Sequence, residues 1–138
     1  MFEYSATSRS QLETCDERIQ LTFNEALRLQ VVDIKILKGH RGTEEQQRMF
    51  HEGLSELDGI TRFSKHQSYP SLAVDAAALP LVWTDHSRFT MFAGFIIGIA
   101  ASNGIIMRSG TDWNRNFSTK DHKFFDGPHF EIVEGVTS

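Results

Sequence analysis

Residues 72–79 read LAVDAAAL, an apolar stretch that a single carboxylate, Asp75, interrupts. Its length and composition predict a short buried strand. A buried carboxylate costs several kcal/mol unless it is paired, hydrogen-bonded or bound to a cation. Taken alone, the stretch therefore favours a salt bridge, or a hydrogen bond to a loop backbone, as the partner of Asp75.

The segments before this strand change between helical and extended patterns. Ser10–Glu13 has the spacing of a capping box, and the helical periodicity that follows predicts a helix over residues 10–30. Alternating apolar and polar residues over 32–36 predict a half-buried strand. Residues 43–53 begin with a second capping box and predict a short helix that ends near Gly53.

The segments after the strand include the most apolar part of the chain, residues 91–101. This run is shorter than the roughly 20 residues of a membrane-spanning helix, so it predicts a core helix that ends near Ser102. Strands are predicted over residues 105–108 and 130–133, with a long loop over 109–127 between them. Because helices and strands are mixed without the regular spacing of βαβ units, we predict an α+β fold.

Composition limits the number of domains and the kinds of partner. The 138 residues suit one domain, and no linker or repeat divides them, so residues 1–138 are expected to form a single unit without a separate binding module. The net charge is −4, and lysines and arginines are not clustered. This pattern argues against nucleic acid as the main partner and against electrostatic attachment to a membrane.

Cysteine content and the N-terminal segment bear on the compartment. Cys15 is the only cysteine, so it cannot form an internal disulfide, and its spacing on the predicted helix indicates a buried thiol. The first ten residues, MFEYSATSRS, lack the basic and apolar segments of a secretory signal. We therefore expect synthesis in the cytoplasm without a signal peptide.

Two histidines are placed where they could join Asp75 at a metal ion. His66 ends a polar loop, and His129 follows a turn that leads into the last predicted strand. Two histidines, one carboxylate and an open fourth position form the ligand set of a catalytic zinc ion. Asp126, three residues before His129, could serve such a site as a general base. Spacing alone leaves separate surface or core roles for the histidines as the better-supported reading.

Short motifs occur in a characteristic order: GHRG at residues 39–42, SKH at 64–66, AVD at 73–75, GTDW at 110–113 and DGPHFE at 126–131. Together they resemble the VanY-like zinc peptidases. That family includes D-alanyl-D-alanine carboxypeptidases and the L-alanyl-D-glutamate endopeptidases that serve as bacteriophage endolysins. The resemblance implies a small antiparallel sheet that carries the zinc site, with helices packed on it.

The resemblance also implies roles for individual residues. It implies one zinc ion per chain, bound by His66, Asp75 and His129. It implies that Asp126 acts first as the base and then as the acid that protonates the leaving amine. Arg41 is implied to bind a substrate carboxylate or the developing oxyanion, as a guanidinium can.

Two further residues receive substrate-binding roles from the resemblance. Ser64 is expected to form a hydrogen bond near the metal, and Trp113 is expected to form a wall of the cleft. From the residues alone, a buried tryptophan is more often part of a core, and Arg41 reads as a surface charge beside a turn.

The chain departs from the family pattern at two places. Eight residues separate His66 from Asp75, where many relatives have six, and Ser71 stands where they have a glycine. Asp126 stands where carboxypeptidase relatives usually carry glutamate, and the shorter acid resembles the phage endopeptidases. Separately, the polar residues of Asp112–Ser118 alternate like the start of a calcium loop, but the central glycine is replaced by Phe117, which favours a solvated loop.

The sequence thus predicts a zinc-dependent endolysin that cleaves the L-alanyl-D-glutamate bond of the peptidoglycan stem peptide. A D-alanyl-D-alanine carboxypeptidase is the nearest alternative, and a non-catalytic peptidoglycan-binding module is an alternative of another class. We expect a monomer that has no stable association with membranes. It would reach the wall from the host cytoplasm only after a holin-type protein permeabilises the membrane.

Overall fold

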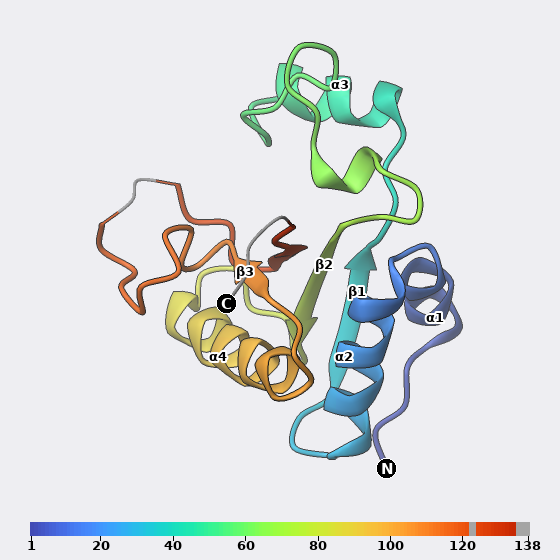
Figure 1. The fold of residues 1–138 in the computed structure, drawn as a ribbon, viewed down its shortest axis with the longest axis vertical. Coiled ribbons are helices and arrows are strands. Elements are labelled where there is room, and N and C mark those ends of the chain that lie inside the picture. Colours follow the sequence, from blue (N-terminus) through green and yellow to red (C-terminus); the bar gives the residue numbers. More distant parts are fainter. Residues whose placement is uncertain (122–123, 135–138) are drawn as a thin grey trace.

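The computed structural model describes residues 1–121 and 124–134, which form a four-stranded antiparallel sheet with helices packed against it (Figure 1). In chain order the elements are α1 (Ala6–Glu13), α2 (Glu17–Arg28), β1 (Ile34–Lys38), α3 (Thr43–His51), the 3-10 helix η1 (Lys65–Gln67), β2 (Ala73–Ala78), α4 (His86–Ser102), β3 (Met107–Ser109) and β4 (His129–Ile132). The strand order across the sheet is β1-β2-β4-β3. The predicted α+β class is confirmed.

The helix predicted over residues 10–30 is wrong, because the chain forms two helices with a break at Cys15. Cys15 forms a parallel bridge with Ser71, which is distant in sequence. The backbone N–H of Asp16 donates to the carbonyl of Ser71 (2.9 Å), and the N–H of Ser71 donates to that of Thr14 (2.8 Å). Cys15 is buried, as expected, although it lies between helices rather than on one.

Helix caps also differ from the predicted capping boxes. Ser5 caps α1 by accepting from the N–H of Ser8, so the spacing at Ser10–Glu13 is not used. The side chain of Asp16 caps α2. Helix α3 has Gly42 at its N-cap without a side-chain cap, so the second predicted box is also wrong. Short polar side chains several residues apart meet cap spacing by chance, and the chain direction at the helix start decides which one is used.

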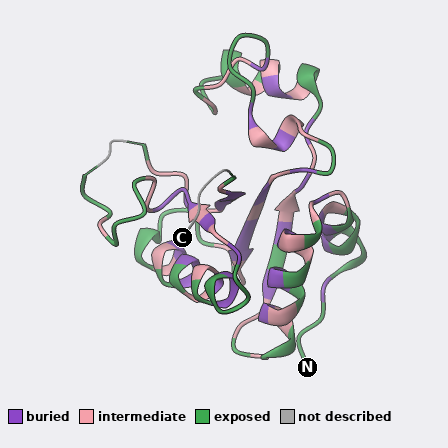
Figure 2. Ribbon diagram, in the orientation of Figure 1, coloured by how far each residue is buried: buried purple, intermediate pink, exposed green. Residues whose placement is uncertain are grey.

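The core lies between the helices and one face of the sheet, where Figure 2 shows the buried residues. Strand residues alternate between faces, and on the helical face β2 contributes Val74 and β4 contributes Phe130. The ring of Phe130 contacts Phe23 of α2 (centroids 5.5 Å apart) and Phe92 of α4 (6.0 Å), edge to face in both cases. The alternate residues of β2 and β4 therefore point to the opposite face of the sheet.

Helix α4 is the core helix that the apolar run predicted. Its buried side includes Phe92, Ile96 and Ala100, whereas Met91 is 75% exposed. Among the described residues, no helix combines the length and the apolar character needed to cross a membrane.

Candidate metal centre

The three predicted ligands meet on the sheet face opposite the core helices. Asp75 of β2 and His129 of β4 are direct cross-strand partners, and η1 brings His66 beside them. The Oδ1 atom of Asp75 lies 3.2 Å from Nε2 of His66 and 3.5 Å from Nδ1 of His129. One ligand atom from each residue lies within 4.8 Å of the others. Two imidazoles and a carboxylate are a donor set that fits zinc.

Outer hydrogen bonds select which nitrogen each histidine presents. Nδ1 of His66 lies 2.7 Å from the carbonyl oxygen of Gly39, which can only accept, so this nitrogen carries the proton. Nε2 of His129 lies 2.8 Å from Oε1 of Glu131 and donates to it in the same way. Each ring therefore turns its other nitrogen, Nε2 of His66 and Nδ1 of His129, toward Asp75, and in the neutral form of the ring that nitrogen could donate its lone pair to a metal ion.

The backbone around His66 is fixed by Ser64 and Arg41, which belong to two of the quoted motifs. The hydroxyl of Ser64 accepts from the N–H of His66 (3.2 Å), and the N–H of Ser64 donates to the side chain of Gln67 (2.8 Å). The N–H of Arg41 donates to the carbonyl of His66 (2.7 Å). Ser64 thus caps η1 and lies outside the group of ligand atoms.

The guanidinium of Arg41 is buried and tied to the ligand group. Its Nη2 donates to Oδ2 of Asp75 (3.3 Å), and its Nη1 donates to the side chain of Gln46 (2.8 Å). Gln46 is fully buried and donates in turn to Ser55 and to the carbonyl of Leu57. Arg41 is 5% exposed, and within the described residues its Nε atom has no hydrogen-bond partner. In this geometry Arg41 holds the oxygen of Asp75 that points away from the histidines.

Asp126 lies at the edge of the ligand group, with Oδ2 3.9 Å from Nδ1 of His129. Its N–H donates to the carbonyl of Gly110 (3.0 Å), and its own carbonyl accepts from the N–H of His129 (3.1 Å). A Cβ atom at Gly110 would lie 2.1 Å from the carbonyl oxygen of Asp126, so this close approach requires glycine. Burial and the nearby charge of Asp75 raise the pKa of Asp126, which suits a group that gives and takes protons.

The neighbouring carboxylates and His129 are electrostatically linked. Burial acts to raise the pKa of Asp75, but the charges and hydrogen bonds of His66 and His129 outweigh it and hold this pKa below its usual range. Burial acts to lower the pKa of His129, but hydrogen bonds from its ring to Asp75 and Glu131 raise it to about 9. Without a bound metal, the His129 imidazolium and the carboxylates of Asp75 and Glu131 therefore stabilise each other's charged forms.

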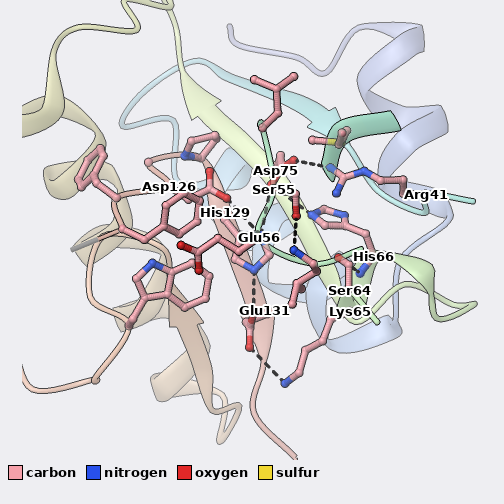
Figure 3. A pocket seen from close by; sticks show the side chains of 18 of the residues that line it. Arg41, Ser55, Glu56, Ser64, Lys65, His66, Asp75, Asp126, His129 and Glu131 are labelled. Carbon is pink, nitrogen blue, oxygen red and sulfur yellow. Dashed lines mark hydrogen bonds and ion pairs between the residues drawn. The ribbon is translucent and has the colours of Figure 1, made fainter. Parts of the chain in front are cut away.

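The ligand group forms part of the floor of a cavity of about 870 Å³ (Figure 3). Leu54 and Phe63 line it on the side of α3, and Trp83 and Phe125 line it on the side of α4. Trp113 lies in the wall beside the candidate ligands, with its ring 5.2 Å from that of His129. The volume and the mostly apolar and aromatic lining are typical of a binding site for a small ligand or a short peptide.

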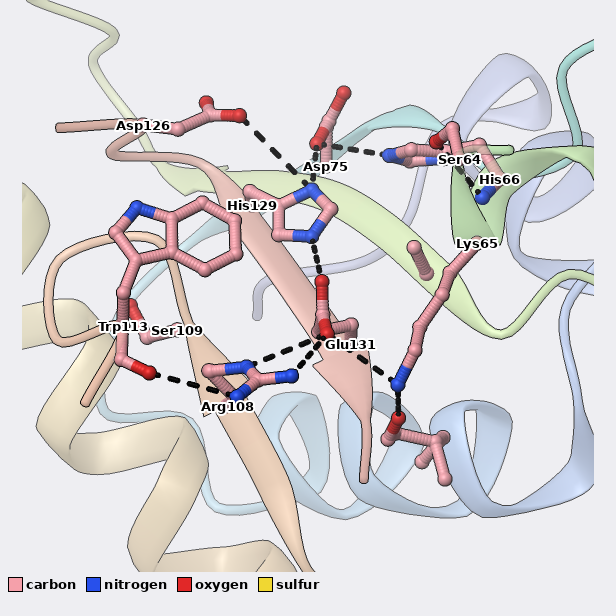
Figure 4. A network of polar contacts seen from close by, with 12 residues as sticks. Ser64, Lys65, His66, Asp75, Arg108, Ser109, Trp113, Asp126, His129 and Glu131 are labelled. Carbon is pink, nitrogen blue, oxygen red and sulfur yellow. Dashed lines mark hydrogen bonds and ion pairs between the residues drawn. The ribbon is translucent and has the colours of Figure 1, made fainter. Parts of the chain in front are cut away.

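Sequence reasoning missed a charged group behind His129. Glu131 bonds His129 on one side, and Arg108 (2.9 Å) and Lys65 (3.3 Å) contact its other oxygen (Figure 4). The His-x-Glu spacing on a predicted strand was a usable signal, because residues i and i+2 share a face. Arg108 could not be assigned from spacing, since its place opposite Glu131 depends on the pairing of β3 with β4.

In the loop of Asp112–Ser118, whose sequence resembles the start of a calcium site, backbone N–H groups bind the first carboxylate. The carboxylate of Asp112 accepts from the N–H groups of Asn116 (3.2 Å) and Phe117 (2.9 Å). Both carboxylate oxygens of Asp112 therefore help to hold the loop backbone.

Comparison with known proteins connects this geometry to a family. The model of the family described as phage L-alanyl-D-glutamate peptidase matches residues 1–133. The comparison with curated proteins gives no match.

Two solved structures share the fold. The L-Ala D-Glu endopeptidase ChiX of Serratia marcescens is 25% identical, with a TM-score of 0.72 over 95% of this chain and 90% of that one. A mutant of the vancomycin resistance D,D-pentapeptidase VanY, in complex with Zn(II), is 20% identical, with a TM-score of 0.55 over 86% of this chain and 72% of that one. The family match spans nearly the whole chain, so the chain belongs to the phage L-alanyl-D-glutamate peptidase family and is a peptidoglycan peptidase.

Proposed function

We propose that this protein is a zinc-dependent endopeptidase that hydrolyses the L-alanyl-D-glutamate bond of the peptidoglycan stem peptide, and that it serves as a phage endolysin. The observation that carries the proposal is the convergence of His66, Asp75 and His129 on one point of the cavity floor. The family description and the endopeptidase ChiX support the choice of bond. We propose one zinc ion per chain, held by these three side chains.

Bound zinc would lower the pKa of a water molecule and polarise the scissile carbonyl. Asp126 borders the ligand group, where its carboxylate takes a proton from the attacking water. Its raised pKa then lets it return that proton to the leaving amine. One side chain thus performs both proton transfers.

Arg41 is proposed to orient Asp75 and to place a positive charge beside the substrate. Its bond to Asp75 and its burial support orientation of the ligand carboxylate. Its position in the cavity lining also leaves its charge beside the substrate, where it favours a carboxylate or a developing oxyanion. Trp113 is proposed to contact substrate as part of the cavity wall, whereas Ser64 is proposed to act through the backbone of His66.

The proposal includes the setting in which the enzyme acts. We propose that the chain works as a monomeric catalytic domain on the stem peptide, and that a holin-type protein first opens the membrane. The net charge of −4 supports recognition through the cavity rather than general electrostatic binding to anionic surfaces.

Zinc content and lysis, measured together, test the proposal. The wild type should contain about one zinc per chain by elemental analysis and should lyse outer-membrane-permeabilised bacteria. His129→Ala should lose both the metal and the activity. His51→Ala is a matched control, because His51 is an exposed residue of α3 outside the cavity lining, and it should retain both.

The products identify the bond. Mass analysis of digested muropeptides should show release of stem-peptide fragments that begin with glutamate. Loss of terminal D-alanine alone would instead identify a carboxypeptidase. A wild-type protein that binds peptidoglycan without cleaving it, even with zinc supplied, would identify a binding module and refute the proposal.

A further inference from the structure

The sheet places a buried carboxylate directly behind one metal ligand. His129 and Glu131 are two residues apart on β4, so their side chains share the face that carries the site. Oε1 of Glu131 lies 2.8 Å from Nε2 of His129, the ring nitrogen that faces away from Asp75. Glu131 is 7% exposed, and its other oxygen does not contact the ligand group but faces two cations.

Both cations lie on elements held by backbone contacts, β3 by its pairing with β4 and η1 by its Ser64 cap. Arg108 is its cross-strand partner on β3 and donates to Oε2 through Nη2 (2.9 Å) and Nε (3.3 Å). Lys65 precedes His66 in η1, and its Nζ lies 3.3 Å from Oε2 and also donates to the carbonyl of Ile132. The two cations offset the cost of burying the carboxylate, so Glu131 is held in one orientation (Figure 4).

We infer that Glu131 is the positioning residue for His129, and that Arg108 and Lys65 fix Glu131 in that role. The carboxylate holds the proton of His129 on Nε2 and thereby directs Nδ1 toward Asp75 and His66. This inference rests on the proposed zinc site. It gives a role to Glu131 and Lys65, which stand in the quoted motifs without one, and to Arg108, which lies outside them. Lys65 links the two histidines, since it adjoins His66 in sequence and contacts the partner of His129.

The two histidines differ in the strength of this support. His66 donates to a neutral backbone carbonyl, that of Gly39, whereas His129 donates to an ionised carboxylate, and charge-assisted hydrogen bonds are the stronger kind. A side-chain partner can be replaced by mutation but a carbonyl cannot. Outer partners of metal-bound histidines typically contribute 10–100-fold to metal affinity, so Glu131→Ala should weaken zinc binding by about that factor.

A purely structural role would give a different result. Arg108 and Glu131 would then form only a cross-strand ion pair that stabilises the sheet. In that case Glu131→Ala would lower the unfolding temperature but would leave the affinity of the folded protein for zinc unchanged.

Zinc affinity, measured by competition with a chromogenic chelator on folded protein, separates the two roles. Glu131→Ala should raise the Kd for zinc about 10–100-fold, and Glu131→Gln, whose amide oxygen can still accept from Nε2, should fall between this variant and the wild type. Lys65→Met, which keeps the aliphatic stem, should weaken binding by a smaller factor. Glu25→Ala is the matched control, because Glu25 pairs with Arg28 on α2 and does not line the cavity, and it should bind zinc like the wild type.

Nitrogen-15 spectra of the imidazole rings give a second readout that does not depend on activity. In the zinc-loaded wild type, His129 should carry its proton on Nε2 and His66 should carry its proton on Nδ1. Glu131→Ala should shift the Nε2–H signal of His129 and leave the His66 signals in place. Unchanged Kd values and unchanged His129 signals in folded Glu131→Ala would overturn the inference.

Two other outcomes are also decisive. Glu131→Ala could fail to fold, which circular dichroism would show, and the Kd values of Glu131→Gln and Lys65→Met for zinc then decide. Wild-type Kd values for both variants would overturn the inference, and weaker zinc binding would support it. A wild-type protein that binds no zinc would refute the proposed function and, with it, this inference. Failure of the inference alone is recognised by normal zinc binding in every variant.

Discussion

The Asp126→Asn variant should bind zinc as the wild type does but should hydrolyse peptidoglycan far more slowly. Asp126 is outside the three-residue ligand group, with its carboxylate 3.9 Å from Nδ1 of His129. Asparagine has nearly the same shape, and the hydrogen bonds that place residue 126, to Gly110 and from His129, use only its backbone. Zinc content should therefore stay near one per chain.

The size of the rate loss follows from the proton transfers that asparagine cannot perform. A positioned acid or base contributes about 10²–10⁴-fold to a rate, which corresponds to about 2.7–5.4 kcal/mol of activation free energy. Because Asp126 is assigned both transfers, kcat should fall at least about 100-fold, whereas KM should change little.

The pH profile gives a second measure of the same group. As a base, Asp126 must be ionised, and burial together with the charge of Asp75 raises its pKa. Activity should therefore be lost, as pH falls, at values above the ordinary pKa of aspartate, which is about 3.9. The residual activity of Asp126→Asn should lack this acidic limb.

The assay is chromatography of muropeptides released from purified peptidoglycan, with zinc measured on the same samples. Asp33→Asn is a suitable control, since Asp33 adjoins the other end of β1 and its carboxylate accepts from the N–H of Ile34. A zinc-loaded Asp126→Asn protein with more than about a tenth of wild-type kcat would refute the assignment of Asp126, because a general base contributes at least about 10²-fold.

Four further predictions concern the scaffold. Gly39→Ala should reduce both the free energy of unfolding and the zinc affinity, because the new Cβ would lie 2.2 Å from the carbonyl oxygen of Gln11 and would displace the Gly39 carbonyl that orients His66. Gly98→Ala should instead stabilise α4 by about 0.5–1 kcal/mol in urea denaturation, because the new Cβ meets no atom within 4 Å. Cys15 should resist thiol reagents in the folded protein, and burial raises its pKa to about 12. The thiol of the unfolded chain ionises from about pH 8.5, whereas the buried thiol stays protonated, so the free energy of unfolding should fall as pH rises, by about 2 kcal/mol at pH 10. Cys15→Ala should lack this pH-dependent loss. Phe130→Ala should lower the free energy of unfolding by about 3–5 kcal/mol, because its ring is fully buried, and a loss below about 1 kcal/mol would contradict the packing described above.

The sequence predicted the parts of the fold that depend on local pattern. The apolar run of α4 and the buried strand around Asp75 were recognisable from composition, and the structure has both. The break at Cys15 was not recognisable, because apolar residues continue at helical spacing through it. Its cause is the bridge to Ser71, a contact between distant segments that no local pattern contains.

The site shows the same division between local and distant information. The resemblance named His66, Asp75 and His129, and the structure brings these side chains together, although residue spacing alone did not favour a metal site. The motif also named Arg41, but its bond to Asp75 depends on how the turn after β1 packs against β2. Glu131 stood in the quoted motif without a role, since its partner Arg108 is known only from the pairing of strands.

The pairing of Asp75 with His129 across β2 and β4 would make metal binding at this site sensitive to strand register. A slip of one residue in β4 would turn His129 into the core and would expose Phe130 in the cavity, because successive residues point to opposite faces. Zinc would bind only the correctly paired sheet, and at 1,000 times its Kd it would favour that pairing by about 4 kcal/mol. Free zinc during refolding should therefore increase the fraction of molecules in which β4 pairs in its native register, at the expense of slipped registers.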